Sequence, residues 1–313
     1  MTNVMVKIGG LLTTVQDNGR IGYQKYGITQ AGVMDVESYR YANALVGNSP
    51  DAAVLEINYM GPELIFEEDT MIAVTGADCL LTINGEEVAM NESHLVPAGG
   101  SLRFVQMRKG VRSYLAFGGE IDIPEVNGSK STFFKGHIGG FEGRQLKPKD
   151  ILRLRSPKPF KKRVLAAEFK PTLSQDVTLR VVMGPQDDYF TDEGIKTFLG
   201  DSPYTVTKYA DRMGYRLDGA EISFKEGADI ISDGTAMGAI QVPKDGKPII
   251  LMADRQTTGG YTKIATVISA DLPIVAQLAG NAKIHFVALS LEEAAEVGKW
   301  FREKIERAEQ YLA

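Results

Sequence analysis

The chain has 313 residues, of which 43% are hydrophobic and 24% are charged, a composition typical of a globular protein long enough for two domains. Its net charge of −5 at pH 7 argues against a general electrostatic attraction to nucleic acid or an anionic membrane, and no apolar run approaches the ~20 residues that span a bilayer. Cys79 is the single cysteine and excludes an internal disulfide, and the first residues lack the apolar core of a signal peptide, so we expect a cytoplasmic protein.

The first half of the chain alternates mostly with period two, which predicts β-strands. A helix is expected at Met34–Gly47, where apolar and aromatic residues recur at helical spacing until a terminal glycine. "CLLTINGEEVAM" predicts two strands joined by a tight turn at Asn84-Gly85. "VRSYLAFGG" reads as a further strand.

A linker is expected at Arg155–Asp176, which combines prolines with the basic run Lys161-Lys162-Arg163. We therefore predict one domain over residues 1–160 and a second over residues 161–313. Short echoes between the halves, such as "GPELIF" and "GAEISF", suggest that both domains share one architecture, although chance can produce such patterns.

The second half repeats the same design. "TLRVVMG" predicts a strand, Asp187–Gly200 a weak helix, and "AIQVPKDGKPIILM" a hairpin around Asp245-Gly246. Ser290 and Glu293 form a capping box for a terminal helix with one apolar face. The prediction is a mainly β protein with few helices.

Four stretches hold polar residues that a plain β-barrel does not need. They are the glycine-rich Thr13–Gly27, "GITQAGVMD" with Asp35, "YADRMGYRL" (Tyr209–Leu217) and "DRQTTGG" (Asp254–Gly260), which directly follows the apolar strand Pro248–Ala253. Arginine presents a planar fork that grips carboxylate or phosphate, and an adjacent aspartate can orient it, accept a proton or merely pair with it. Structural alternatives stay open: each Asp-Arg pair can be scaffold, and Asp35 can simply cap a helix.

The sequence lacks the motifs of several common kinds of active site and binding site. The sequence contains no G-x-x-x-x-G-K-[ST] phosphate loop and no G-x-S-x-G nucleophile elbow. The three histidines lie far apart without partners at zinc-site spacing, so no metal site is expected. The residues alone predict an anion-binding site with the capacity for proton transfer.

In order along the chain, these stretches resemble the allophanate hydrolase subunit 2 family, which includes the C subunit of 5-oxoprolinase, an antagonist of a sporulation histidine-kinase inhibitor and the matching half of the urea carboxylase carboxyltransferase domain. The resemblance rests on "GLLTTVQDNGRIGYQKYG", "GVMD", "YLAFGGEIDIP", "GSKSTF", "GGFEGR", "DRMGYRL" and above all "GAIQVPKDGKPIILMADRQTTGGYTKIATVISADLP". It covers about residues 10–288.

The resemblance implies two cyclophilin-like β-barrel domains and a heteromeric complex with a subunit 1 type (kinase-inhibitor-like) protein and a third oxoprolinase subunit. The implied reaction is opening of 5-oxo-L-proline to L-glutamate with ATP, bound by this chain or by a partner. Candidate catalytic residues are Asp211, Arg212, Asp254 and Arg255; candidate substrate-binding residues are Gln16, Asp17, Arg20, Asp35, Gln241, Gln256, Thr257 and Thr258.

Two other functions stay open: a component of a biotin-dependent carboxyltransferase, with the biotin carried by another protein because the chain has no Met-Lys-Met attachment motif, and a non-enzymatic antagonist of the kinase inhibitor. We also expect the "VQDNGR" loop and the "DRQTTGG" strand exit to line one cleft, with "DRMG" beside them, because ligand sites favour domain interfaces.

Overall fold

The computed structural model describes residues 1–313 and divides into two compact units. Unit 1 comprises Met1–Ile21, Ala31–Leu173 and Glu303–Ala313, and unit 2 comprises Gly22–Gln30 and Ser174–Arg302. The main division thus lies inside the predicted linker, and each unit takes one short segment from the far end of the chain. The domain boundary at residues 160/161 stays a prediction.

Unit 1 is built on a ten-stranded sheet around two long strands, β5 and β8. These strands pair from Ile83↔Leu102 to Ile72↔Phe117, and on the other edge of β8 the strands β3 and β4 pair with its two ends. The strands of unit 1 are β1 (Thr2–Ile8), β2 (Leu12–Gln16), β3 (Val54–Asn58), β4 (Glu63–Phe66), β5 (Thr70–Ile83), β6 (Glu86–Val88), β7 (Ser93–Val96), β8 (Ser101–Phe117), β9 (Glu120–Ile121) and β10 (Ile151–Arg155).

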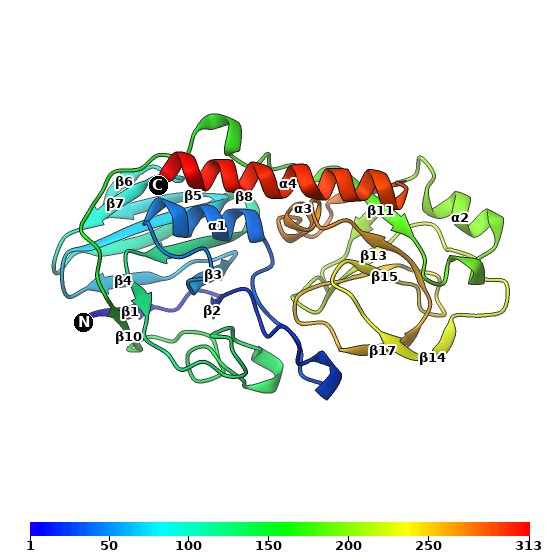
Figure 1. Ribbon diagram of the computed structural model, residues 1–313, viewed down its shortest axis with the longest axis horizontal. Helices are drawn as coiled ribbons and strands as arrows, with labels where there is room; N and C mark the ends of the chain where they lie inside the picture. The colour runs from blue at the N-terminus through cyan, green and yellow to red at the C-terminus, as the bar shows by residue number, and fades with distance from the viewer. The chain divides into compact units, whose positions relative to one another are not determined.

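The core of unit 1 consists of apolar side chains that alternate along these strands, such as Val4, Val6, Leu55, Ile57 and Leu115, all fully buried. The helix α1 (Val36–Leu45) packs on β5 and β8 (Figure 1). The predicted hairpin is confirmed: β5 and β6 join at Asn84-Gly85, and both turn residues have positive φ, as a type I′ turn requires.

Unit 2 contains a closed barrel of seven strands, in the order β11-β18-β15-β16-β13-β12-β19, and a separate two-stranded ribbon, β14 and β17 (Figure 1). Many of the buried side chains of unit 2 are apolar, and the buried rings of Phe198 and Phe286 stack at a centroid distance of 4.5 Å. The strands are β11 (Asp176–Met183), β12 (Tyr204–Val206), β13 (Gly214–Asp218), β14 (Asp229–Gly234), β15 (Ala239–Gln241), β16 (Ile249–Leu251), β17 (Thr258–Tyr261), β18 (Lys263–Val267) and β19 (Lys283–Ala288).

The remaining helices are α2 (Asp192–Phe198), α3 (Leu272–Ala276) and α4 (Leu291–Leu312), with short 3₁₀ turns at Gln24–Tyr26, Phe134–Gly136, Ala167–Phe169 and Asp187–Tyr189. The capping box of α4 is confirmed: the Ser290 hydroxyl accepts from the Glu293 N–H at 3.1 Å, and the Glu293 carboxylate accepts from the Ser290 N–H at 2.8 Å. None of the helices carries an apolar run long enough for a membrane crossing.

The mainly β prediction is confirmed, with a barrel in unit 2 and a half-barrel sheet in unit 1. One local detail differs from the expectation. β15 and β16 do pair as antiparallel neighbours, but a longer connection joins them, and Asp245-Gly246 forms only its tip, closed by the Gly246 N–H on the Pro243 carbonyl. Pro243 and Pro248 flank this tip and lack the N–H that a ladder needs, so the strands cannot extend to the turn.

Candidate functional site

Arg255 occupies the exit of the buried strand β16. Its side chain is buried, with 4% of the residue exposed. The guanidinium donates to three neutral oxygens: the carbonyls of Thr235 (3.2 Å) and Met252 (3.3 Å) and the side-chain oxygen of Gln30 (3.4 Å). Burial lowers the pKa of Arg255 to about 10.

A buried cation with only neutral acceptors is costly to desolvate, because carbonyl and amide dipoles compensate a full charge poorly. A carboxylate or phosphate at this guanidinium would supply the missing negative charge and accept charge-assisted hydrogen bonds. Arg255 therefore has the electrostatics of an anion-binding residue rather than of a structural ion pair.

Two glutamine amides lie next along this surface. The Gln256 amide nitrogen donates to the Gln241 side-chain oxygen at 3.1 Å, and the Gln256 carbonyl accepts from the Thr235 hydroxyl. Gln241 is 2% exposed, and its amide nitrogen has no hydrogen-bond partner within the protein. Because buried donors are almost always satisfied, this nitrogen is a candidate donor to a ligand.

The segment Gly22–Gln30 belongs to unit 2 and supplies residues to Arg255 that the sequence interpretation missed. Besides the Gln30 contact, the Thr29 hydroxyl donates to the Arg255 carbonyl at 3.3 Å. The only signal in the sequence is the polar Thr29-Gln30 pair in "GITQAGVMD", a stretch in which the sequence interpretation singles out Asp35 alone.

The two Asp-Arg motifs meet in an unexpected pairing. The Arg212 guanidinium grips the Asp254 carboxylate through two hydrogen bonds, of 2.8 and 3.0 Å, and both side chains are buried. Asp254 thus pairs across the fold and not with its neighbour Arg255. Asp211 accepts from the N–H groups of Met213 (2.7 Å) and Gly214 (3.2 Å), which is the role of an aspartate that shapes a turn.

Thr257 and Thr258 lead from the strand exit into the ribbon of unit 2. The Thr257 carbonyl accepts from the Thr235 N–H at 3.1 Å, and Thr258 begins β17 opposite Gly234 of β14. Thr258 is exposed and Thr257 half-buried.

The remaining candidate residues lie in unit 1 and are engaged with its own loops. The Asp17 carboxylate accepts from the hydroxyls of Ser129 (2.6 Å) and Ser131 (2.5 Å) and from the Lys130 N–H (2.6 Å). The Gln16 amide donates to the Thr132 carbonyl at 3.0 Å. These bonds fix the "GSKSTF" loop.

Arg20 and Asp35 are likewise buried in unit 1. Arg20 donates to the Ser131 carbonyl, next to Gly139, where any side chain would collide with the guanidinium. Asp35 accepts from the Ser38 N–H (3.0 Å) and hydroxyl (2.7 Å), which confirms the helix-cap interpretation. The single-cleft hypothesis stays a prediction.

The comparisons with known proteins identify the family. Residues 26–288 match the family model described as carboxyltransferase domain, subdomain A and B. The chain belongs to the carboxyltransferase domain family.

Two curated relatives match this carboxyltransferase domain over at least 90% of both chains. The chain is 40% identical to the C subunit of 5-oxoprolinase from Escherichia coli over 93% of both chains, and 35% identical to the protein of the same name in Haemophilus influenzae over 91% of this chain and 90% of that one. The solved structure of the Kluyveromyces lactis urea amidolyase superposes with a TM-score of 0.93 at 34% identity, over 98% of this chain but only 20% of that one. The resemblance seen in the sequence motifs is confirmed.

Gly259 of this carboxyltransferase domain lies against the Gln241 amide, which leads to a first prediction. A Cβ at Gly259 would lie 2.4 Å from the Gln241 nitrogen, whereas a Cβ at Gly260 would approach nothing closer than 3.5 Å. We expect Gly259→Ala to displace Gln241, to lower the activity of the assembled enzyme about tenfold and to cost about 1 kcal/mol of stability through overpacking. Gly260→Ala is the matched control, and equal rates for both variants would remove Gln241 from the site.

Proposed function

We propose that this chain is a subunit of an ATP-dependent 5-oxoprolinase, which opens 5-oxo-L-proline to L-glutamate. The observation that carries the proposal is the 40% identity to the Escherichia coli 5-oxoprolinase C subunit over 93% of both chains. Because the match covers nearly all of both chains, the two proteins share their architecture over nearly their whole length. Because that relative is named as one subunit of its enzyme, the likeness also supports an assembly with other chains.

The chemistry explains why such an enzyme needs ATP. A lactam is stabilised by amide resonance, so water attacks it slowly. Transfer of the γ-phosphoryl group of ATP to the lactam oxygen releases ADP and makes the ring carbon electrophilic. Water adds to that carbon, the C–N bond breaks to give an acyl phosphate, and another water molecule hydrolyses this to glutamate and phosphate.

Within this reaction we propose that Arg255 binds an anionic group, either the substrate carboxylate or the transferred phosphate, and that Gln241 and Gln256 donate further hydrogen bonds to it. Support comes from the three neutral acceptors around a buried guanidinium. We propose a positioning role for Arg212 and Asp254, since each holds the other. In the absence of a phosphate-loop motif, we assign the binding of ATP to a partner, the kinase-inhibitor-like protein or a third subunit.

A second candidate function is carboxyl transfer, with biotin carried by another protein. It is favoured by the TM-score of 0.93 to the urea amidolyase of Kluyveromyces lactis. However, the chain spans only about a fifth of that protein's length, so the likeness concerns only that part of the relative.

Reconstitution tests the proposal. We expect the purified chain alone to release no glutamate from 5-oxoproline and ATP, and the assembly with the other two subunits to do so. The control replaces 5-oxoproline with urea in the presence of a carboxylated biotin carrier. Urea-dependent turnover without glutamate release would favour carboxyl transfer, and glutamate release by the chain alone would refute the multi-subunit proposal.

A further inference from the structure

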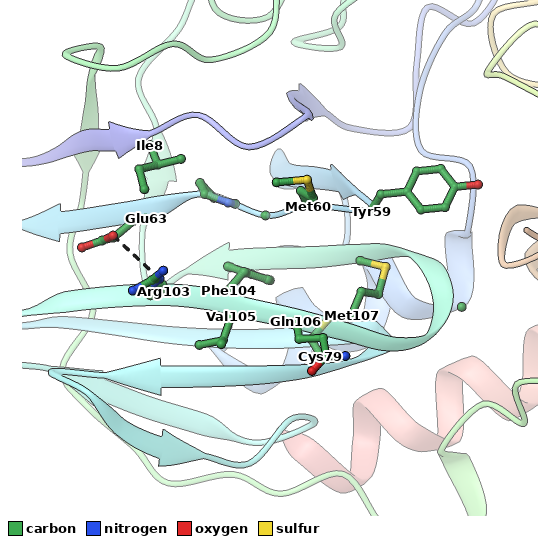
Figure 2. Close-up of a pocket in the computed structure, with 13 residues that line it drawn as sticks. Ile8, Tyr59, Met60, Glu63, Cys79, Arg103, Phe104, Val105, Gln106 and Met107 are labelled. Carbon is green, nitrogen blue, oxygen red and sulfur yellow. Dashed lines mark ion pairs between the residues drawn. The ribbon is translucent and has the colours of Figure 1, made fainter.

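Unit 1 contains a cavity of about 580 Å³ that no sequence motif marked. One wall is β8 from Arg103 to Met107, and the facing wall is the connection between β3 and β4, Tyr59–Pro62, with Glu63 at the start of β4 (Figure 2). Cys79 of β5 and Ile8 at the end of β1 complete the lining. The volume lies within the ~300–1,000 Å³ typical of pockets that bind a ligand.

The backbone beside this cavity is an open strand edge. β5 follows β8 along one side, while on the other side β4 and β3 pair only with the two ends of β8. Two hydrogen bonds close the gap at its limits, from the Phe104 N–H to the Pro62 carbonyl (3.2 Å) and from the Tyr59 N–H to the Val111 carbonyl (3.0 Å). Between them no strand pairs with Val105–Gly110 on this side, and an unpaired edge is a template for another chain.

Four of the apolar side chains that line the cavity are exposed. Met60 is 68% exposed, Val105 and Ile8 are each 46% exposed, and Tyr59 is 42% exposed. Tyr59 also has a φ of 57°, a conformation that costs energy for a bulky residue. Contiguous exposed apolar side chains of this kind mark interaction sites.

One end of the cavity carries excess positive charge. Lys7 and Arg103 share the single carboxylate of Glu63, at 2.7 and 3.9 Å, and Figure 2 shows the Glu63–Arg103 pair at the rim. Both cationic side chains are more than half exposed, at 57% and 58%. In a chain of net charge −5, this local excess of cations is complementary to an acidic group.

We propose that this cavity is the docking site for an extended segment of another subunit of the complex, in which an apolar side chain is followed by an acidic residue. The inference rests on the proposed function, because the oxoprolinase assembly supplies the segment. The main chain of the segment pairs with the open edge of β8, its apolar side chain lies between Met60 and Val105, and its carboxylate meets Arg103 and Lys7. The unpaired backbone favours a polypeptide over a small ligand, which would leave that edge unused.

The test uses the full chain with the other 5-oxoprolinase subunits. Met60→Glu and Val105→Glu place a carboxylate on the apolar wall, and both positions are exposed enough for the fold to tolerate the change. Leu95→Glu is the matched control, since Leu95 is 40% exposed on β7 of the same sheet and does not line the cavity. We expect each cavity variant to weaken assembly at least tenfold, with no change for the control, and hydrogen exchange of Val105–Gly110 to slow at least tenfold in the wild-type complex.

The outcomes separate the two proposals. If the wild-type chain assembles into an active enzyme and both cavity variants assemble equally well, the docking site is wrong while the proposed function stands. Unchanged exchange at Val105–Gly110 in that active complex refutes the docking site as well. If the wild-type chain does not assemble with these subunits, the proposed function fails and the docking proposal fails with it.

Discussion

Replacing Arg255 with lysine is expected to lower kcat/KM of the assembled enzyme about 100-fold, while the free energy of unfolding falls by only about 1 kcal/mol. Lysine keeps the charge but replaces a planar fork with a single ammonium group, which cannot hold an anion two-pronged and also reach the carbonyls of Thr235 and Met252. The cost to folding stays small because the guanidinium is itself expensive to bury without a counter-ion.

The measurement pairs steady-state kinetics of the complex with thermal unfolding of the chain. Arg180→Lys is the matched control, because Arg180 also lies in unit 2 but grips the Asp271 carboxylate at 2.5 and 3.1 Å. We expect that variant to lose a similar amount of stability and to keep its rate. A rate for Arg255→Lys that follows its stability, as in the control, would make Arg255 a structural residue.

Local sequence signals predicted much of the fold because the interactions behind them are local. The Asn84-Gly85 turn depends on two residues that accept positive φ, and the α4 capping box on two residues three apart in the chain. The cap of α1 by Asp35 was likewise open to prediction, since Ser38, its partner, follows within one helical turn.

The chemistry of the candidate site depends on long-range contacts, which no local pattern encodes. Arg212 reaches Asp254 because β13 pairs antiparallel with β16 in the register Gly214↔Leu251, which brings the start of β13 beside the exit of β16. The sequence left open whether each aspartate orients the arginine beside it, accepts a proton or merely pairs with it. Gln30 reaches Arg255 across 225 positions because Gly22–Gln30 packs with unit 2 rather than with its neighbours in sequence.

The candidate residues fall into two groups, according to whether the protein supplies partners for the charge or hydrogen-bonding groups of their side chains. The carboxylates of Asp17 and Asp35 accept several hydrogen bonds from the protein around them, as structural carboxylates do. Arg255 and Gln241 instead keep a charge or a donor that the described protein atoms do not match. A ligand would gain the most binding free energy at Arg255 and Gln241, because it would offset the desolvation cost of groups that are buried without a matching partner.

Breaking the Arg212–Asp254 pair is expected to have the largest effect on stability. Both side chains are buried, at 7% and 6% exposure, so Asp254→Asn removes a negative charge that compensates the Arg212 guanidinium in a poorly solvated place. We expect the free energy of unfolding to fall by about 3–5 kcal/mol. Activity should fall with it, because the loss of the side-chain pair loosens the strand exit that positions Arg255, although the N–H of residue 254 still donates to the Arg212 carbonyl, at 2.7 Å in the wild type.

The double variant Arg212→Met, Asp254→Leu tests whether the ion pair only positions Arg255 or acts on the substrate directly. Replacing both members of a buried ion pair with apolar residues of similar volume is often neutral, so we expect the double variant to unfold within about 1 kcal/mol of the wild type. If the pair only positions Arg255, the activity of the stable double variant should lie within about tenfold of the wild-type activity. A double variant that is as stable as the wild type but inactive would show that Asp254 or Arg212 acts on the substrate directly, since stability would no longer account for the loss.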